Sequence, residues 1–308
     1  MFDVVLLTDY RYEKPEKKNW YINQVLKEDQ LLLDALTSKG LKVCKKDWNC
    51  KKFNWKKTKS AIFRSTWDYF DKFDEFFDWK EKNKKHLLFI NSSKLIDWNI
   101  NKIYLKELYD KGINIPESIF IKKGDKINLR NLFNENKFTT AILKPNISGA
   151  ARHTYKIEKN KLNDFEIIFK KLLEKKDMIF QNYMTNIVEE GEISLIMIGG
   201  EHTHSVKKKA KKGDFRVQDD HGGTVENYKP SNEEIKFAQR CIEKCPERTL
   251  YARVDIIYDN ENKLALNELE LIEPELWFRE YPKSAEILAD QVNNYLLDIK
   301  NTSNSISS

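Results

Sequence analysis

The sequence predicts a mixed α/β (α+β) protein of three α/β units, the first of them a doubly wound domain with a parallel sheet. Three observations support this fold class. The 308 residues exceed what one ordinary hydrophobic core accommodates. The first hundred residues alternate apolar runs with amphipathic segments, as a parallel sheet with crossover helices requires. Residues 251–274 show two strand-like runs around the polar turn 259–262, which predicts a hairpin.

Composition and charge limit the classes of partner. The net charge is +6, from 54 basic and 48 acidic residues, which is mild for this length. Lysine runs at 51–59 and 207–212 could bind nucleic acid, but no stacking pattern is interleaved with them. We therefore expect solvated surfaces, no nucleic-acid partner and a small anionic substrate. The four cysteines show neither a zinc spacing nor a disulfide framework.

The N-terminus and the hydropathy predict a cytoplasmic protein without a membrane partner. An apolar strand at 2–7 is followed at once by Asp9 and charged residues, unlike a signal peptide. No apolar run approaches the length of a membrane span.

The first unit begins with a strand at 2–7 and an amphipathic helix at 20–39 that Gly40 ends. Further strands are expected at 41–44, 61–64 and 87–91, with a helix at 70–82. Ligands bind such sheets at the carboxyl ends of the strands.

The segment 64–69 lies at such a strand end, directly before the helix expected at 70–82. Ser65, Thr66 and the helix amides could bind a substrate carboxylate, and Asp68 could bind an ammonium group. The alternative is that Thr66 or Asp68 only caps the helix. We place the substrate between this segment and the charged loop that carries Arg216.

The second unit is expected to contain a helix from about 102 to 111, strands at 118–121, 139–143, 154–157 and 178–183, and a helix at 162–175. The strand at 139–143 leads into Lys144, and a loop with Ser148 and Gly149 follows. A lysine before a small-residue loop suits phosphate binding by backbone N–H groups, although a single glycine is a weak signal.

The third unit is expected to contain strands at 192–198 and 202–207 and a helix at 230–244 with a capping box formed by Ser231 and Glu234. The hairpin strands 252–258 and 263–271 follow, then a helix at 284–299 and a disordered tail.

The hairpin carries three carboxylates. Asp255 lies among apolar residues, where a carboxylate is costly without a cation, and Glu268 and Glu270 project from one face of their strand. Such a hard-oxygen set suits Mg²⁺. The alternative is a hairpin whose charged face is merely solvated.

Several motifs, in this order, resemble the ATP-grasp superfamily: Lys102, Lys144-Pro145, Gln181–Met184, Asp255 and Glu268-Leu269-Glu270. The chain is most similar to the glutathione-synthetase and ribosomal-modification ligase branch. The runs RSTWDY, GDFRVQ and ELELIEP, with the segment 98–105, narrow this to a subgroup like the D-cycloserine ligases. The resemblance covers about residues 97–300. It implies an ATP-grasp fold with a doubly wound pre-ATP-grasp domain at 1–97, a central subdomain at 98–185 and a C-terminal subdomain with the metal site at 186–300. The polar composition of residues 301–308 predicts the disordered tail.

The resemblance also implies roles for individual residues. Lys102, Lys144, Ser148 and Gly149 would contact the phosphates of ATP. Gln181, Asn182, Tyr183 and Met184 would form the hinge against adenine. Glu192 takes the ribose position, with Glu189 and Glu190 as competitors. Asp255, Glu268 and Glu270 would bind Mg²⁺, for which Mn²⁺ is an alternative. The phosphate loop has a single glycine where the branch has several. Arg152 would compensate with its charge and is expected to join the substrate-binding set.

The implied activity is an ADP-forming ligase that joins a carboxylate to an amine through an acyl phosphate. The substrates would be amino-acid-like or peptides, and an intramolecular cyclisation is an open alternative. Arg216 and Arg253 would stabilise the transferring phosphoryl group and the oxyanion; Arg253 could instead be a structural partner of Asp255 or Glu268. The rival function is a non-catalytic ATP-binding or regulatory module, and a homodimer stays open.

Overall fold

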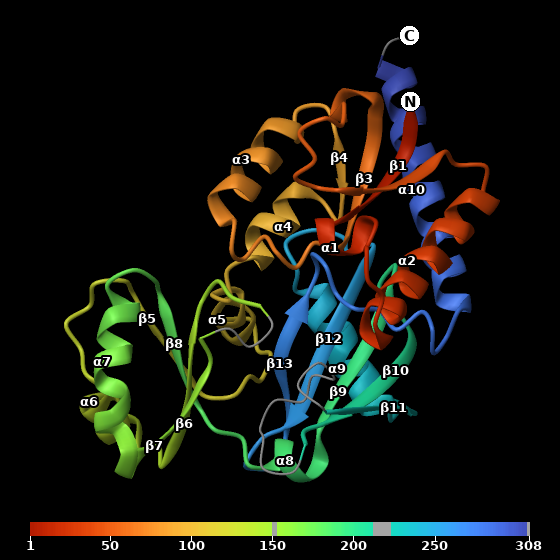
Figure 1. The fold of residues 1–308 in the computed structure, drawn as a ribbon. Helices are drawn as coiled ribbons and strands as arrows, with labels where there is room; N and C mark the ends of the chain where they lie inside the picture. Colours follow the sequence, from red (N-terminus) through yellow and green to blue (C-terminus); the bar gives the residue numbers. More distant parts are fainter. Residues whose placement is uncertain (150–152, 212–222, 307–308) are drawn as a thin grey trace.

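The computed structural model describes residues 1–149, 153–211 and 223–306. Its strands form three sheets, shown in Figure 1 with the first at the top, the second at the left and the third in the centre. Helices and sheets alternate along the chain, so the predicted α/β fold class is confirmed.

The first sheet is entirely parallel, as predicted. Its spatial order is β2 (Val43–Asp47), β1 (Phe2–Thr8), β3 (Thr58–Ser65) and β4 (Leu88–Ile90). Its helices are α1 (Tyr10–Glu13), α2 (Trp20–Ser38), α3 (Phe73–Asn83) and α4 (Ser93–Asn99). Helix α3 begins three residues later than expected, after a series of turns at 66–72. The sequence analysis missed α4, whose first turn is capped by the hydroxyl of Ser92.

The second sheet is antiparallel, in the order β5 (Ser118–Ile121), β8 (Met178–Asn182), β6 (Thr140–Pro145) and β7 (Tyr155–Glu158). Helices α6 (Leu129–Asn136) and α7 (Leu162–Leu173) pack on one face, where Phe133 and Phe169 are fully buried. Helix α5 (Tyr104–Asp110) connects this unit to the first. The sequence analysis missed α6, a short helix capped by the Asn128 side chain.

The third sheet is antiparallel, in the order β11 (Thr224–Tyr228), β10 (Glu201–Lys209), β9 (Glu192–Ile198), β12 (Tyr251–Tyr258) and β13 (Leu264–Glu270). The short helix α8 (Asn186–Glu190) precedes β9. The predicted hairpin is confirmed, with Asp255 opposite Glu268. Helix α9 (Asn232–Glu243) has the predicted capping box between Ser231 and Glu234.

The C-terminal helix α10 (Lys283–Ile306) runs along α2 (Figure 1) and joins the third unit to the first. Leu32 and Leu36 of α2 share a fully buried cluster with Leu288 and Val292 of α10. The helix continues through most of the segment for which the sequence predicts a disordered tail, because this shared core stabilises its preceding turns. No helix in the described ranges is long and apolar enough to cross a membrane.

Buried charges fix the loop after β13 to the first unit. The Glu28 carboxylate accepts hydrogen bonds from the backbone N–H groups of Phe278 and Arg279, each at 3.0 Å. Arg64 donates to the Pro274 carbonyl at 3.1 Å. All of these groups lie far from bulk water, so an unpaired partner would be costly. The loop therefore holds a defined position beside β3.

Candidate active site

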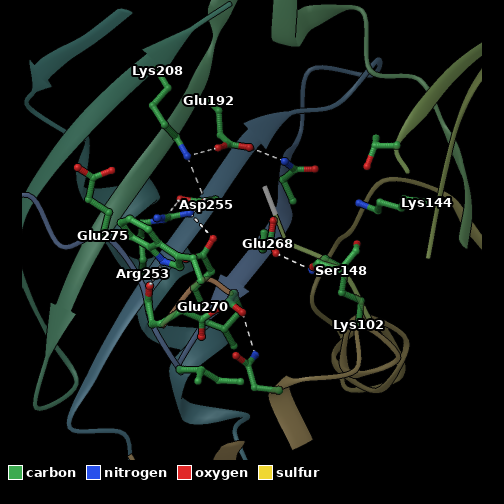
Figure 2. A pocket seen from close by; sticks show the side chains of 18 of the residues that line it. Lys102, Lys144, Ser148, Glu192, Lys208, Arg253, Asp255, Glu268, Glu270 and Glu275 are labelled. Carbon is green, nitrogen blue, oxygen red and sulfur yellow. Dashed lines mark hydrogen bonds and ion pairs between the residues drawn. The ribbon is translucent and has the colours of Figure 1, made fainter. Parts of the chain in front are cut away.

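A cavity of about 430 Å³ lies where the three units meet. Charged residues from β6, β9, β10, β12 and β13 and from the start of α5 surround it (Figure 2). Its charged lining residues are Arg11, Lys102, Lys144, Glu192, Lys208, Arg253, Asp255, Glu268, Glu270, Glu273 and Glu275. Six of these charged residues belong to the predicted nucleotide and metal sites, and Arg253 was predicted as catalytic. The other four, Arg11, Lys208, Glu273 and Glu275, were not expected from the sequence.

Asp255 is the centre of a buried charge network. It is 1% exposed and accepts hydrogen bonds from Arg253, at 2.9–3.1 Å, and from the Ser194 hydroxyl, at 2.5 Å. The Lys208 ammonium lies 3.4 Å away. Burial opposes the charge of Asp255, but Arg253 and Lys208 outweigh it and hold its pKa below the ordinary value. Asp255 is therefore ionised at neutral pH.

The two glutamates of β13 each have their own cation (Figure 2). Lys102 Nζ lies 2.9 Å from Glu268 Oε1 and also donates to the Ser148 carbonyl at 2.7 Å. Arg253 bridges Asp255 and Glu270. Burial raises the pKa of Glu270 to about 8, with repulsion from Glu268 and Asp255 adding to the effect. Around Glu270, the carboxylates therefore carry more negative charge than Arg253 and Lys102 neutralise.

The three proposed magnesium ligands, Asp255, Glu268 and Glu270, are neighbours in the hairpin. Their cationic partners are Arg253 and Lys208 for Asp255, Lys102 for Glu268, and Arg253 for Glu270. In the described part of the chain, no group of three or more His, Cys, Asp or Glu side chains is arranged to hold a metal ion. The donor chemistry nevertheless fits Mg²⁺, because Asp255, Glu268 and Glu270 offer only hard oxygen ligands. A divalent cation would also relieve the repulsion that raises the pKa of Glu270.

Lys144 faces the cavity from the opposite side, at the end of β6. Its ammonium donates to Gln181 Oε1 at 3.3 Å, and the Gln181 amide donates to the Ser118 hydroxyl at 2.9 Å. Burial lowers the pKa of Lys144 to about 8, and the charge of Lys102 contributes. A partly buried ammonium whose hydrogen-bond partner is a neutral amide is well suited to bind an anion.

Lys208 is a functional candidate that the sequence analysis missed. It is 4% exposed, forms an ion pair with Glu192, and its ammonium points to Asp255. These two carboxylates outweigh the opposing effect of burial and raise its pKa. Its position within a lysine run predicts a solvated side chain, and the structure instead buries it. Its inward position follows from the alternation of β10, because the buried Val206 lies two residues earlier.

Glu192 lies inside the cavity wall, where it accepts hydrogen bonds from Lys208 and from the Asn267 amide. Its predicted competitors, Glu189 and Glu190, are exposed and do not line the cavity. The geometry therefore favours Glu192 of the three.

The hinge segment closes another side of the cavity. Gln181, Asn182, Tyr183 and Met184 all line it. Met184 is 7% exposed and packs with Ile257 and Ala265, which gives this end of the cavity an apolar surface.

The predicted substrate contacts at Ser65, Thr66 and Asp68 require correction. All three are buried and none lines the cavity. Ser65 is hydrogen-bonded to Thr8 at 2.6 Å, and the Asp68 carboxylate is engaged by Trp48 Nε1 and Lys72 Nζ, each at 2.7 Å. The helix α3 begins only at Phe73, so its first amides are also not at this segment.

Other side chains of the segment 65–70 do line the cavity. Trp67, Tyr69 and Phe70 line it, together with Arg11 from α1. Gly149 packs so closely on Phe70 that a Cβ atom would lie 2.1 Å from its ring. Two further predicted residues, Arg152 and Arg216, lie outside the described residues.

Comparison with known families gives two matches along the chain. Residues 101–274 match the model of the prokaryotic glutathione synthetase ATP-grasp domain, and residues 4–91 match that of the D-cycloserine synthetase DcsG N-terminal domain. A curated relative, the cycloserine biosynthesis protein DcsG of Streptomyces lavendulae, is 22% identical over 189 residues. The match covers 58% of this chain and 61% of that relative, less than two thirds of its length.

Solved structures show the same fold. The crystal structure of D-cycloserine synthetase DcsG superposes with a TM-score of 0.84 at 18% identity, covering 95% of this chain and 99% of that one. D-alanine–D-alanine ligase from Bacillus anthracis gives a TM-score of 0.69 at 15% identity, covering 98% and 100%. These matches confirm the resemblance drawn from the motifs.

Proposed function

The chain belongs to the family of the prokaryotic glutathione synthetase ATP-grasp domain, and from this premise we propose that it is an ATP- and Mg²⁺-dependent ligase joining a carboxylate to an amine. The observation that carries the proposal is that one cavity is lined both by the cations Lys102, Lys144, Lys208 and Arg253 and by the carboxylates Asp255, Glu268 and Glu270. A triphosphate needs this combination, because its transfer chemistry depends on positioning and charge neutralisation.

In this proposal ATP spans the cavity from the hinge to the hairpin. Adenine packs on Met184 in the apolar end, and Glu192 is placed to accept a hydrogen bond from ribose. Lys102, Lys144 and Lys208 bind the phosphates, and the backbone of Ser148 and Gly149 contacts them as well. Asp255, Glu268 and Glu270 would hold Mg²⁺, which supplies charge neutralisation to the phosphates when bound.

The reaction has two steps. A substrate carboxylate oxygen attacks the terminal phosphorus, the bond to the bridging oxygen breaks, and ADP leaves with that electron pair. A nitrogen nucleophile then attacks the acyl carbon, and inorganic phosphate leaves. Arg253 touches Asp255 and Glu270 and is positioned to stabilise the charge that develops on the oxygens. Arg216, which lies outside the described residues, is proposed for the same task.

The substrates proposed are amino-acid-like molecules or a peptide end, which would lie against Arg11 and the tyrosines that line the cavity. Intramolecular closure, as in the D-cycloserine type, belongs to the same proposal. We also propose the subdomain division at 97/98 and 185/186. The separation of the strands into three sheets supports three units, and the boundary at 97/98 falls within α4.

The test is ADP release from ATP and Mg²⁺ in the presence of a panel of D- and L-amino acids, with hydroxylamine as a trap. An acyl phosphate gives a hydroxamate, so ADP and hydroxamate should appear together and only with an accepted carboxylate. ATP binding without either product for every carboxylate would favour the non-catalytic module instead.

A further inference from the structure

We propose that Glu273 binds the ammonium form of the nitrogen nucleophile and takes one proton from it before attack. This inference depends on the proposed ligase function and names a catalytic residue for its second step. Glu273 lines the cavity three residues beyond the last proposed metal ligand, in the loop that leaves β13.

Glu273 differs from the other cavity carboxylates in its partner. Among the described residues, five carboxylates that line the cavity each have a cationic partner. These pairs are Glu192 with Lys208, Asp255 with Arg253 and Lys208, Glu268 with Lys102, Glu270 with Arg253, and Glu275 with Arg279. Glu273 instead accepts a hydrogen bond from the neutral Tyr69 hydroxyl, at 3.0 Å. The position for a cation beside it is therefore left to a ligand.

The backbone around Glu273 is held firmly from the first unit. Trp67 Nε1 donates to the Glu273 carbonyl at 3.2 Å, and Arg64 donates to the Pro274 carbonyl at 3.1 Å. Tyr69 is 2% exposed, so its hydroxyl is fixed as well. These contacts set the carboxylate in the cavity wall, beside Trp67, Tyr69 and Phe70, which line the same cavity.

The charges that face Glu273 explain its proton affinity. Burial raises its pKa to about 7, the Tyr69 hydrogen bond and Lys102 act in the opposite direction, and Glu268 adds repulsion. Glu270, the last residue of β13, and Glu273 also repel each other. A group that titrates near neutral pH exchanges protons with an amine more readily than an ordinary carboxylate does.

The proton balance of the second step follows. The ammonium gives one proton to the Glu273 carboxylate, which becomes a carboxylic acid. The neutral nitrogen forms the C–N bond, the C–O bond to phosphate breaks, and phosphate leaves with that electron pair. The amide nitrogen loses its second proton to the departing phosphate, and Glu273 returns its proton to solvent.

Glu273→Gln tests the inference, because glutamine keeps the size and the acceptor for Tyr69 but cannot take a proton. The accepted carboxylate is assayed with two kinds of nucleophile. Hydroxylamine is largely unprotonated at neutral pH and needs no base, whereas ammonia, methylamine and the amino acids are ammonium ions. We expect hydroxamate formation close to the wild-type rate and kcat with the ammonium nucleophiles lowered about 10²- to 10³-fold. Glu261→Gln, in the exposed hairpin turn, is the matched control.

Tyr69→Phe gives a second and independent reading. Without its hydrogen bond the Glu273 carboxylate is less stabilised, so its pKa rises, and the acidic limb of kcat/KM for the amine should move to higher pH. The pH dependence of the rate with hydroxylamine should not show this shift.

Equal losses with both kinds of nucleophile in Glu273→Gln would overturn the inference and leave the ligase function standing. A wild-type chain that forms the hydroxamate but accepts no ammonium nucleophile would also overturn it. If the wild-type chain forms no hydroxamate with any carboxylate, the ligase function fails, and the role of Glu273 fails with it.

Discussion

Replacing Lys144 with methionine should stabilise the ligand-free protein while weakening ATP binding. The Lys144 ammonium is held in the cavity wall with Gln181 as a neutral partner at 3.3 Å, and Lys102 repels it. A charge kept in such a place for a ligand reduces the stability of the empty site. Methionine keeps the length of the side chain and removes the charge.

The magnitude follows from the pKa. A fall from 10.5 to about 8, caused first by burial, corresponds to a penalty of about 3 kcal/mol for the charged form. The side chain is only half-buried and borders an open cavity, so solvent screening should reduce this to about 1–2 kcal/mol. The penalty is fully present below pH 8 and disappears as the pH rises toward 10.5, because the unfolded state then also loses the proton.

The assay is thermal unfolding of Lys144→Met and wild type at pH 7 and pH 9.5, without and with ATP. At pH 7 the variant should unfold about 2–5 °C higher, and the gain should shrink at pH 9.5. Its ATP affinity should fall about 10- to 100-fold through the loss of a charge-assisted hydrogen bond. Lys175→Met, on an exposed surface, controls for the general effect of adding a methionine.

Two outcomes would refute this reasoning. A Lys144→Met protein that is less stable than wild type at pH 7 would mean that the ammonium group stabilises the fold. Unchanged ATP affinity would remove Lys144 from the phosphate site.

Three further predictions concern the site and its supports. Glu268→Gln should lower kcat by at least about 10²-fold. The free energy of unfolding should change by no more than about 1 kcal/mol, because the pair of Glu268 with Lys102 borders the cavity. Near-normal turnover would remove Glu268 from the metal site. Asp255→Asn should destabilise the fold by about 3 kcal/mol, measured by urea unfolding, because it leaves buried Arg253 and Lys208 with an uncompensated charge; an unchanged midpoint would contradict that network. Gly149→Ala should reduce kcat/KM for ATP because its Cβ atom overlaps Phe70, and Phe70→Leu should restore part of the loss in the double variant; additive losses would show that the contact is unimportant.

The sequence predicted the fold where local pattern and tertiary structure agree. The hairpin around Asp255 and the capping box of Ser231 and Glu234 are specified by neighbouring residues, and both are confirmed. Helix α6 was missed because its few apolar positions become a recognisable face only against Phe180 and its neighbours in the sheet.

The candidate site was predictable where a motif determines both which residue is used and toward which side its side chain points. Lys144 and Glu192 lie at strand ends or on strands whose alternation points them into the cavity. The sequence does not predict which side chains of the segment 65–70 face the cavity, because the backbone makes irregular turns after β3. Trp67 and Tyr69 therefore face the cavity in place of Thr66 and Asp68.

Partners from distant parts of the chain were also beyond sequence reasoning. The role of Lys208 depends on Glu192 and Asp255, which lie on two other strands, and that of Glu273 depends on Tyr69 from the first unit. Such pairs become visible only when the sheets have been placed beside one another.

The most direct test of the central claim is the path of oxygen from carboxylate to phosphate. The accepted carboxylate, labelled with ¹⁸O in both oxygens, is turned over with ATP, Mg²⁺ and the amine, and the released phosphate is analysed by mass spectrometry or ³¹P NMR. Attack of the carboxylate on the terminal phosphorus predicts phosphate that carries a single ¹⁸O, with ADP as the other product. Unlabelled phosphate, or the appearance of AMP and pyrophosphate, would contradict an acyl-phosphate ligase.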